Sequence, residues 1–145
     1  MRRLISFDID GTLEAGDPPG RVTFEMVRRA KELGYIIGSA SDRPVPIQRR
    51  IWENAGIAVE FAIHKHNLDR VKAEFEADVY QHIGDTNMDE YYALMHGFEY
   101  LDVAVHFEEP WMLLEAVAEA IIEAEIDAEL ETGKQAADNE GAAAG

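Results

Sequence analysis

Short apolar runs alternate with amphipathic stretches along the first hundred residues of this chain. The apolar runs predict strands. The first begins at Leu4, and the others cover about residues 35–40, 59–63, 79–83 and 100–105. The first run is almost unbroken, which is typical of a parallel strand that is buried on both faces.

The stretches between these runs carry apolar residues at helical spacing. They predict helices over about residues 24–33, 45–55, 68–76 and 88–95. Thr23 is suited to cap the first of these helices, and Gly34 and Gly56 are suited to end the first two. Because strand and helix alternate throughout, we predict an α/β fold with a single doubly wound, Rossmann-like parallel sheet that has helices on both faces.

The end of the chain has a different pattern. Residues 110–130 repeat apolar side chains at helical spacing and predict a last helix, with Pro110 in its first turn. We expect its apolar side to pack against the core, with a dimer contact as the alternative. Residues 133–145 contain nothing to bury, so the predicted organisation is a core domain over 1–132 and a disordered acidic, Ala/Gly-rich tail over 133–145.

Length and composition narrow the class of protein. The 145 residues suit one domain with a hydrophobic core. The absence of cysteine excludes disulfide bonds and thiolate zinc sites. The chain begins without the apolar region of a signal peptide, and no run approaches the length of a membrane span. We therefore expect a cytoplasmic protein with no membrane partner.

The charge of the chain is strongly negative and unevenly placed. The formal net charge is −16, and residues 73–145 hold 19 of the 29 acidic residues but only one of the 13 Lys and Arg residues. Such a surface repels polyphosphate backbones, which makes nucleic acid an unlikely partner. Excess carboxylates also keep proteins soluble at high salt, which is consistent with a salt-adapted source.

Two acidic residues follow the first apolar run and suggest a site at its carboxyl end. Side chains of a strand alternate between faces, so Asp8 and Asp10 are expected to point the same way and to share one site. Gly11 allows a sharp turn in which main-chain N–H groups approach an anion, and Thr12 adds a hydroxyl group. These features predict a phosphate cradle beside two carboxylates.

Residues 8–13 (DIDGTL) resemble the first signature, DxDGTL, of the haloacid dehalogenase superfamily. Most members of that superfamily are Mg²⁺-dependent phosphatases that act through an aspartyl-phosphate. The resemblance implies that Asp8 is the nucleophile and that Asp10 is the general acid and base. It also implies that the Asp8 side chain and the Asp10 main-chain carbonyl ligate Mg²⁺.

The second signature of the family is a Ser or Thr at the end of the second strand, where it hydrogen-bonds the phosphoryl group. Residues 41–44 (SDRP) resemble the Thr-Gly-Arg-Pro of many members, which assigns this role to Ser41, with Ser39 as the alternative. Arg43 of the same motif is a secondary candidate for the site. Asp42 departs from the usual glycine and adds negative charge near an anionic substrate.

The third signature is a lysine that bridges the nucleophile and the phosphate. Lys65 occupies its place before the third helix, and Lys72, inside that helix, is the alternative. His64 and His66 flank Lys65 and could suggest a metal pair, but no further residue has matching ligand spacing.

The fourth signature, GDxxxD, is similar to residues 84–89 (GDTNMD). Asp85, at the end of a predicted strand, is the expected Mg²⁺ ligand, since Mg²⁺ binds a few carboxylates together with waters and phosphate oxygens. Asp89 is a secondary candidate that could reach the ion through water. Its alternative role is that of an acid in the first turn of a helix.

Residues 14–22 are rich in turn-forming residues, and in the family a short hairpin flap occupies this place beside the site. The gaps between the signatures leave no room for the cap domain that many members of the family contain. The resemblance is therefore to capless members, which act on phosphates of larger molecules or use an oligomer to cover the site. We predict a Mg²⁺-dependent phosphomonoester hydrolase that acts on a phosphorylated substrate, small or large. The alternatives are a nucleic-acid 3′-end phosphatase and a catalytically silent interaction module of the same fold.

Overall fold

The computed structural model describes residues 1–108 and 122–131 of the chain. The chain divides into two compact units, residues 1–111 and 112–145. Among the described residues, the first unit contains every strand and the candidate site, and the second is helical over residues 122–131.

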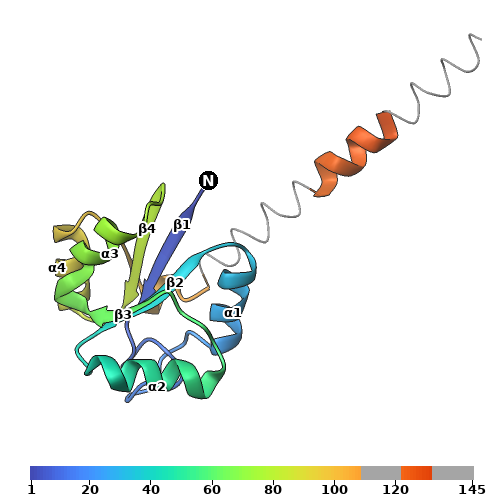
Figure 1. Cartoon of the computed structure of the whole chain (residues 1–145). Helices are drawn as coiled ribbons and strands as arrows, with labels where there is room; N and C mark the ends of the chain where they lie inside the picture. Colours follow the sequence, from blue (N-terminus) through green and yellow to red (C-terminus); the bar gives the residue numbers. More distant parts are fainter. Residues whose placement is uncertain (109–121, 132–145) are drawn as a thin grey trace, which may run out of the picture. The chain divides into compact units, whose positions relative to one another are not determined.

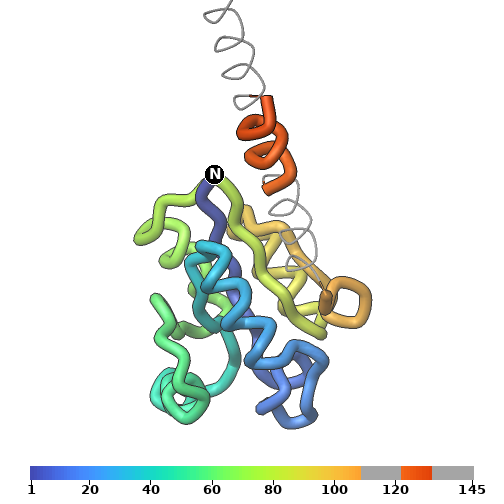
Figure 2. Tube along the Cα trace, turned by 90° about the vertical axis from the view of Figure 1, so that its right-hand side faces the viewer, coloured from blue at the N-terminus to red at the C-terminus, as the bar shows by residue number. Residues whose placement is uncertain are grey.

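The first unit is built on one parallel sheet of five strands in the order β3-β2-β1-β4-β5. The first strand lies in the middle of the sheet, paired with β2 on one side and β4 on the other (Figures 1 and 2). The strands are β1 Arg3–Phe7, β2 Ile36–Ser41, β3 Phe61–His64, β4 Val79–Gly84 and β5 Glu99–Asp102.

Helices cover both faces of this sheet (Figure 1). On one face, the Trp52 ring packs edge-on against Phe7 of the sheet and Phe24 of α1, with ring centroids 6.3 and 5.9 Å apart. On the other face, Leu4 belongs to a buried cluster that includes Leu68 of α3. The helices are α1 Phe24–Glu32, α2 Val45–Ala55, the 3₁₀ helix η1 Lys65–Asn67, α3 Leu68–Glu74, α4 Asn87–Met95 and α5 Val103–His106.

These observations confirm the predicted fold class. The sheet is entirely parallel, and neighbouring residues of β1 alternate between two helical layers, which is why the strand is apolar on both faces. The connections from β1 to β2 and from β2 to β3 contain one helix each, and no cap domain is present in the described part of the chain. Residues 14–22, predicted as a flap, form turns, with Leu13 and Val22 paired at their ends.

Local signals at helix ends are confirmed as well. The Thr23 side chain accepts a hydrogen bond from the Met26 N–H (3.1 Å), which satisfies one free donor of the first turn of α1. Gly56 ends α2 with a left-handed φ of 68°.

The last strand is shorter than predicted. Residues 100–105 were expected to be extended, but β5 ends at Asp102 and residues 103–106 are helical. The Asp102 carboxylate accepts a hydrogen bond from the Ala104 N–H (2.9 Å) and caps this short helix. The β-branched Val103 and Val105 predict a strand, but an aspartate at the N-cap position favours the helix.

The described helix of the second unit, residues 122–131, contains the end of the predicted apolar stripe. Ile122, Ile126 and Leu130 are each at least half exposed. The remainder of the stripe and the predicted tail lie outside the described residues, so the role of the stripe stays a prediction. None of the helices in the described ranges has the length and apolar character needed to cross a bilayer.

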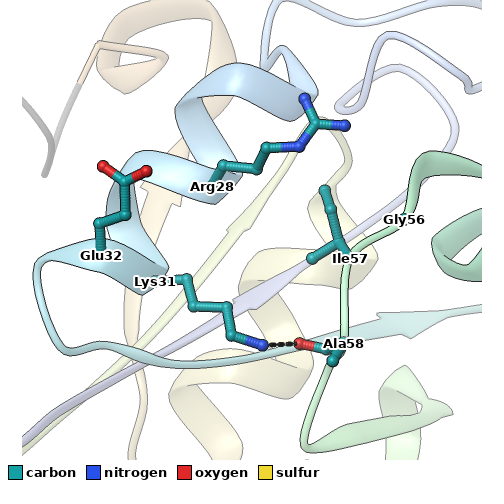
Figure 3. A pocket seen from close by; sticks show the side chains of 6 residues that line it. All are labelled: Arg28, Lys31, Glu32, Gly56, Ile57 and Ala58. Carbon is teal, nitrogen blue, oxygen red and sulfur yellow. Dashed lines mark hydrogen bonds between the residues drawn. The ribbon is translucent and has the colours of Figure 1, made fainter.

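A groove of about 380 Å³ lies beside the strand starts, between the end of α1 and the segment that leads into β3 (Figure 3). Arg28 donates a hydrogen bond to the Ala55 carbonyl (2.7 Å), and Lys31 donates one to the Ala58 carbonyl. Arg28 and Lys31 thus satisfy carbonyl groups at and beyond the end of α2, and this structural role explains why two cationic side chains line the groove. The lining residues are Arg28, Lys31, Glu32, Gly56, Ile57 and Ala58.

Candidate functional site

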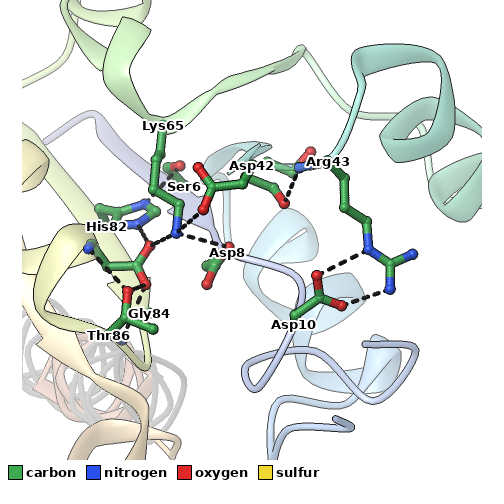
Figure 4. Close-up of polar contacts among 12 residues, drawn as sticks. Ser6, Asp8, Asp10, Asp42, Arg43, Lys65, His82, Gly84 and Thr86 are labelled. Carbon is green, nitrogen blue, oxygen red and sulfur yellow. Dashed lines mark hydrogen bonds and ion pairs between the residues drawn. The ribbon is translucent and has the colours of Figure 1, made fainter. Parts of the chain in front are cut away.

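The candidate site lies at the carboxyl edge of the sheet, where polar side chains from four strand ends meet (Figure 4). Asp8 follows β1, and its N–H donates to the Ile83 carbonyl of β4 (2.9 Å). Lys65 follows β3, and Asp85 follows β4. Parallel pairing places all of these strand ends at the same edge, as the order of the motifs predicted.

Lys65 is the electrostatic centre of the site. Its ammonium group lies 3.1 Å from Asp89 Oδ1, 3.6 Å from Asp42 Oδ2 and 3.7 Å from Asp8 Oδ1. Burial alone would lower the pKa of Lys65, but the charges of Asp8 and Asp89 raise it, so the group stays protonated. Lys72, the alternative candidate, donates to the Gly97 carbonyl instead.

Asp8 is 4% exposed, and its environment disfavours the ionised form. Burial and the negative charge of Asp89 raise the pKa of Asp8 to about 8, although Lys65 opposes them. A bound cation would reverse this effect, because it stabilises the carboxylate over the acid.

The carboxylates of Asp8, Asp85 and Asp89 form a group in which one oxygen from each lies within 4.8 Å of the others. Carboxylate oxygens are the hard ligands that Mg²⁺ binds. The donor set therefore fits a divalent cation of this kind.

Gly11 makes room for Asp85. The glycine has a left-handed φ of 73°, and a Cβ at this position would lie 1.9 Å from Asp85 Oδ2. The main-chain N–H groups expected to form a phosphate cradle have other partners: Gly11 donates to the Pro18 carbonyl (2.7 Å) and Thr12 to the Ile9 carbonyl (3.1 Å). The turn thus satisfies both donors within itself, and phosphate binding by Gly11 and Thr12 stays a prediction.

Thr12 is the other residue of the predicted cradle. Its side chain is fully buried, and the hydroxyl group has no hydrogen-bond partner among the described residues.

Asp10 points to Arg43 (Figure 4), and it does not belong to the group of three carboxylates whose oxygens lie within 4.8 Å of one another. The guanidinium holds both carboxylate oxygens, at 2.6 and 3.0 Å, and the Asp17 N–H donates to one of them (2.8 Å). The hydrogen bonds from Arg43 are the main cause of a lowered pKa at Asp10. Because β1 ends at Phe7, strand alternation does not extend to Asp8 and Asp10, so their shared orientation stays a prediction.

The two candidate serines of β2 have different surroundings. Ser39 is fully buried, donates to Gln48 Oε1 (2.7 Å) and accepts from the Trp52 indole (2.9 Å). The Ser41 hydroxyl lies at the strand end and accepts from the Arg43 N–H (3.1 Å). Ser39 is therefore committed to the packing of α2, and Ser41 is the serine at the edge that carries the site.

His82 was missed by sequence reasoning. It is fully buried on β4, with Nδ1 3.0 Å from Ser6 Oγ on β1 and Nε2 2.9 Å from Asp89 Oδ1. Ser6 and His82 are paired in register on neighbouring strands. The sequence signal that could have revealed them is a polar residue inside each of two apolar runs.

Asp89 is also fully buried. Its carboxylate closes a capping box with Thr86 at the start of α4. Burial alone would raise the pKa of Asp89, but the hydrogen bond from His82 and the charge of Lys65 lower it below its usual range. Asp89 is therefore an ionised, fully surrounded carboxylate.

Comparison with family models, with curated proteins and with solved structures found no match to this chain. The function must therefore be argued from the site itself.

Proposed function

We propose that this chain is a Mg²⁺-dependent phosphomonoester hydrolase of the haloacid dehalogenase superfamily, in which Asp8 forms an aspartyl-phosphate. The observation that carries the proposal is the Asp8–Lys65 pair at the carboxyl edge of a parallel sheet, beside the carboxylate of Asp85. A buried carboxylate next to a fixed ammonium group is suited to attack an anion, because the ammonium group offsets the repulsion between them.

In the first half of the reaction, an Asp8 carboxylate oxygen attacks phosphorus, and the bond between phosphorus and the leaving oxygen breaks. The leaving oxygen takes a proton from Asp10. Lys65 stabilises the charge on the phosphoryl oxygens, and the Ser41 hydroxyl donates a hydrogen bond to them. Asp8 and Asp85 would hold Mg²⁺, which when bound would add positive charge beside the phosphate and keep Asp8 ionised.

In the second half, Asp10 takes a proton from water as the water oxygen attacks phosphorus. The acyl-phosphate bond breaks, which releases phosphate and restores the Asp8 carboxylate. Asp10 must part from Arg43 before it can carry a proton, because the bidentate ion pair lowers its pKa. Guanidinium groups form the same bidentate pair with phosphate, so a phosphorylated substrate can compete with Asp10 for Arg43.

The Asp10–Arg43 pair also favours a second candidate function, a catalytically silent binding module of the same fold. If the pair does not open, Asp10 can neither donate nor accept a proton. Such a protein would bind Mg²⁺ and a phosphorylated ligand without turnover.

Hydrolysis of an aryl phosphate by the full chain, with and without Mg²⁺ and at low and molar salt, tests the proposal. Asp8→Asn removes the nucleophile, and Asp69→Asn, on the exposed side of α3, is a control with the same change in charge. We expect Mg²⁺-dependent turnover that Asp8→Asn abolishes and Asp69→Asn retains. Turnover that persists in Asp8→Asn would refute the mechanism, and a folded wild type without turnover on a broad phosphoester panel would favour the binding module.

A further inference from the structure

We propose that His82 is a positioning residue, whose hydrogen bond keeps Asp89 in contact with Lys65 and prevents it from binding the metal. Asp8 and Asp85 are then the protein carboxylates available to bind the metal. The catalytic part of this inference rests on the proposed phosphatase activity. The assignment of the carboxylates does not, because it concerns hydrogen bonds and metal binding alone.

The first step of the argument is the number of donors that surround Asp89. Oδ1 accepts from His82 Nε2 (2.9 Å) and faces the Lys65 ammonium group (3.1 Å). Oδ2 accepts from the Thr86 N–H (3.1 Å) and from the Thr86 hydroxyl (2.7 Å). A carboxylate offers about four lone-pair positions, and these four contacts occupy them.

To bind a metal ion, Asp89 would therefore have to lose one of these donors. At Oδ1 both donors, His82 and Lys65, are buried, so neither finds water to replace Asp89 when a metal ion displaces it; Thr86, which donates to Oδ2, is exposed. An unpaired buried donor costs about 1–3 kcal/mol, and more when the donor is charged. Direct binding of a cation through Oδ1 is disfavoured for this reason, although one oxygen of Asp89 lies within 4.8 Å of an oxygen of Asp8 and of Asp85.

His82 is the donor in its hydrogen bond with Asp89. Because the ionised Asp89 can only accept, Nε2 of His82 carries the proton of the bond between them. The other ring nitrogen faces Ser6 on the neighbouring strand, so the ring is held from two sides. Space for the Asp89 carboxylate comes from Gly84, where a Cβ would lie 2.3 Å from Asp89 Cγ.

Asp85 has the opposite surroundings. Its side chain is exposed, and none of the residues described in the structure donates a hydrogen bond to it. Its carboxylate faces Gly11, on the turn that follows Asp8. Asp8 and Asp85 thus retain lone pairs for a cation, whereas those of Asp89 are used.

The consequence for Lys65 follows from the same contacts. Its ammonium group lies between Asp89 and Asp8, and the Asp89 carboxylate is held in place by hydrogen bonds from His82 and Thr86 as well. A change at His82 should therefore act on the step in which Lys65 stabilises the phosphoryl group, and not on the affinity for the metal.

The test compares two amide variants of His82 in the full chain. In His82→Gln the amide nitrogen takes about the place of Nε2 and can still donate to Asp89, whereas in His82→Asn it reaches only toward Ser6. Nitrogen-15 NMR should show the His82 proton on Nε2 and a slowly exchanging Lys65 ammonium group in the wild type. We expect the Lys65 signal to persist in His82→Gln and to be lost in His82→Asn.

Kinetics and metal binding complete the test. We expect kcat to fall about 10- to 100-fold in His82→Asn, with KM nearly unchanged, and to fall much less in His82→Gln. Calorimetric titration with Mg²⁺ should show at least a tenfold loss of affinity in Asp85→Asn and less than about a threefold loss in Asp89→Asn.

Three results would overturn the inference: a rapidly exchanging Lys65 in the wild type, equal behaviour of the two His82 variants, or equal losses of Mg²⁺ affinity in Asp85→Asn and Asp89→Asn. The wild-type NMR spectrum decides the matter even if the His82 variants do not fold. If the wild type has no phosphatase activity, the NMR and titration results still decide this inference, whereas the proposed function fails.

Discussion

The contact between Gly11 and Asp85 leads to a prediction with a matched control inside the same chain. Gly11 and Gly56 have nearly the same left-handed backbone, with φ of 73° and 68°. A Cβ on Gly56 would have nothing within 4 Å, whereas a Cβ on Gly11 would lie 1.9 Å from Asp85 Oδ2. Alanine substitutions at the two positions therefore share the backbone penalty and differ in the contact with Asp85.

The magnitudes follow from these two terms. The left-handed conformation should cost each alanine variant about 1–2 kcal/mol of unfolding free energy. In Gly11→Ala the obstructing atoms belong to the end of an exposed side chain, so Asp85 can turn away at an added cost of about 1 kcal/mol. The displaced carboxylate should instead weaken Mg²⁺ binding at least tenfold, or about 1.4 kcal/mol, and Gly56→Ala should leave it unchanged.

Urea unfolding followed by circular dichroism gives the two stabilities, and calorimetric titration gives the two Mg²⁺ affinities. Equal Mg²⁺ affinities in the two variants would show that Asp85 does not bind the metal from the position described. A loss of stability in Gly11→Ala that exceeds the loss in Gly56→Ala by about 3 kcal/mol or more would show that Asp85 is not free to move.

Three further predictions concern the fold and its pH dependence. Gly38→Ala should lose about 3 kcal/mol of unfolding free energy or more, because its Cβ would lie 2.4 Å from the main-chain oxygen of Phe61 on the neighbouring strand; a loss below 1 kcal/mol by urea unfolding would contradict this packing. Thr23→Ala should lose about 1 kcal/mol in the same assay through the missing cap on the Met26 N–H, and an unchanged midpoint would argue against the cap. Without divalent metal, Asp8 should stabilise the fold below about pH 4 and lose this contribution as the pH rises through 8, since folding raises its pKa from 3.8 to about 8; parallel pH–stability curves for wild type and Asp8→Asn would refute this.

The amino-acid sequence by itself determined the fold class and the place of the site. Alternating apolar runs and amphipathic stretches specify a parallel sheet with helices on both faces. In such a sheet every strand ends at the same edge, so the residues that follow β1, β3 and β4 had to meet there. The positions of Asp8, Lys65 and Asp85 follow from this rule without any knowledge of side-chain contacts.

Only the tertiary structure decided how the side chains at that edge are partnered. Asp10, which lies beyond the end of β1, is paired with Arg43, a residue 33 positions away in the chain. Asp89, a candidate ligand in the sequence, is surrounded by donors from three different segments. The bond between Ser6 and His82 joins residues 76 positions apart. Periodicity is a local property of the chain, whereas hydrogen bonds between distant segments depend on the register and spacing that the packed sheet imposes.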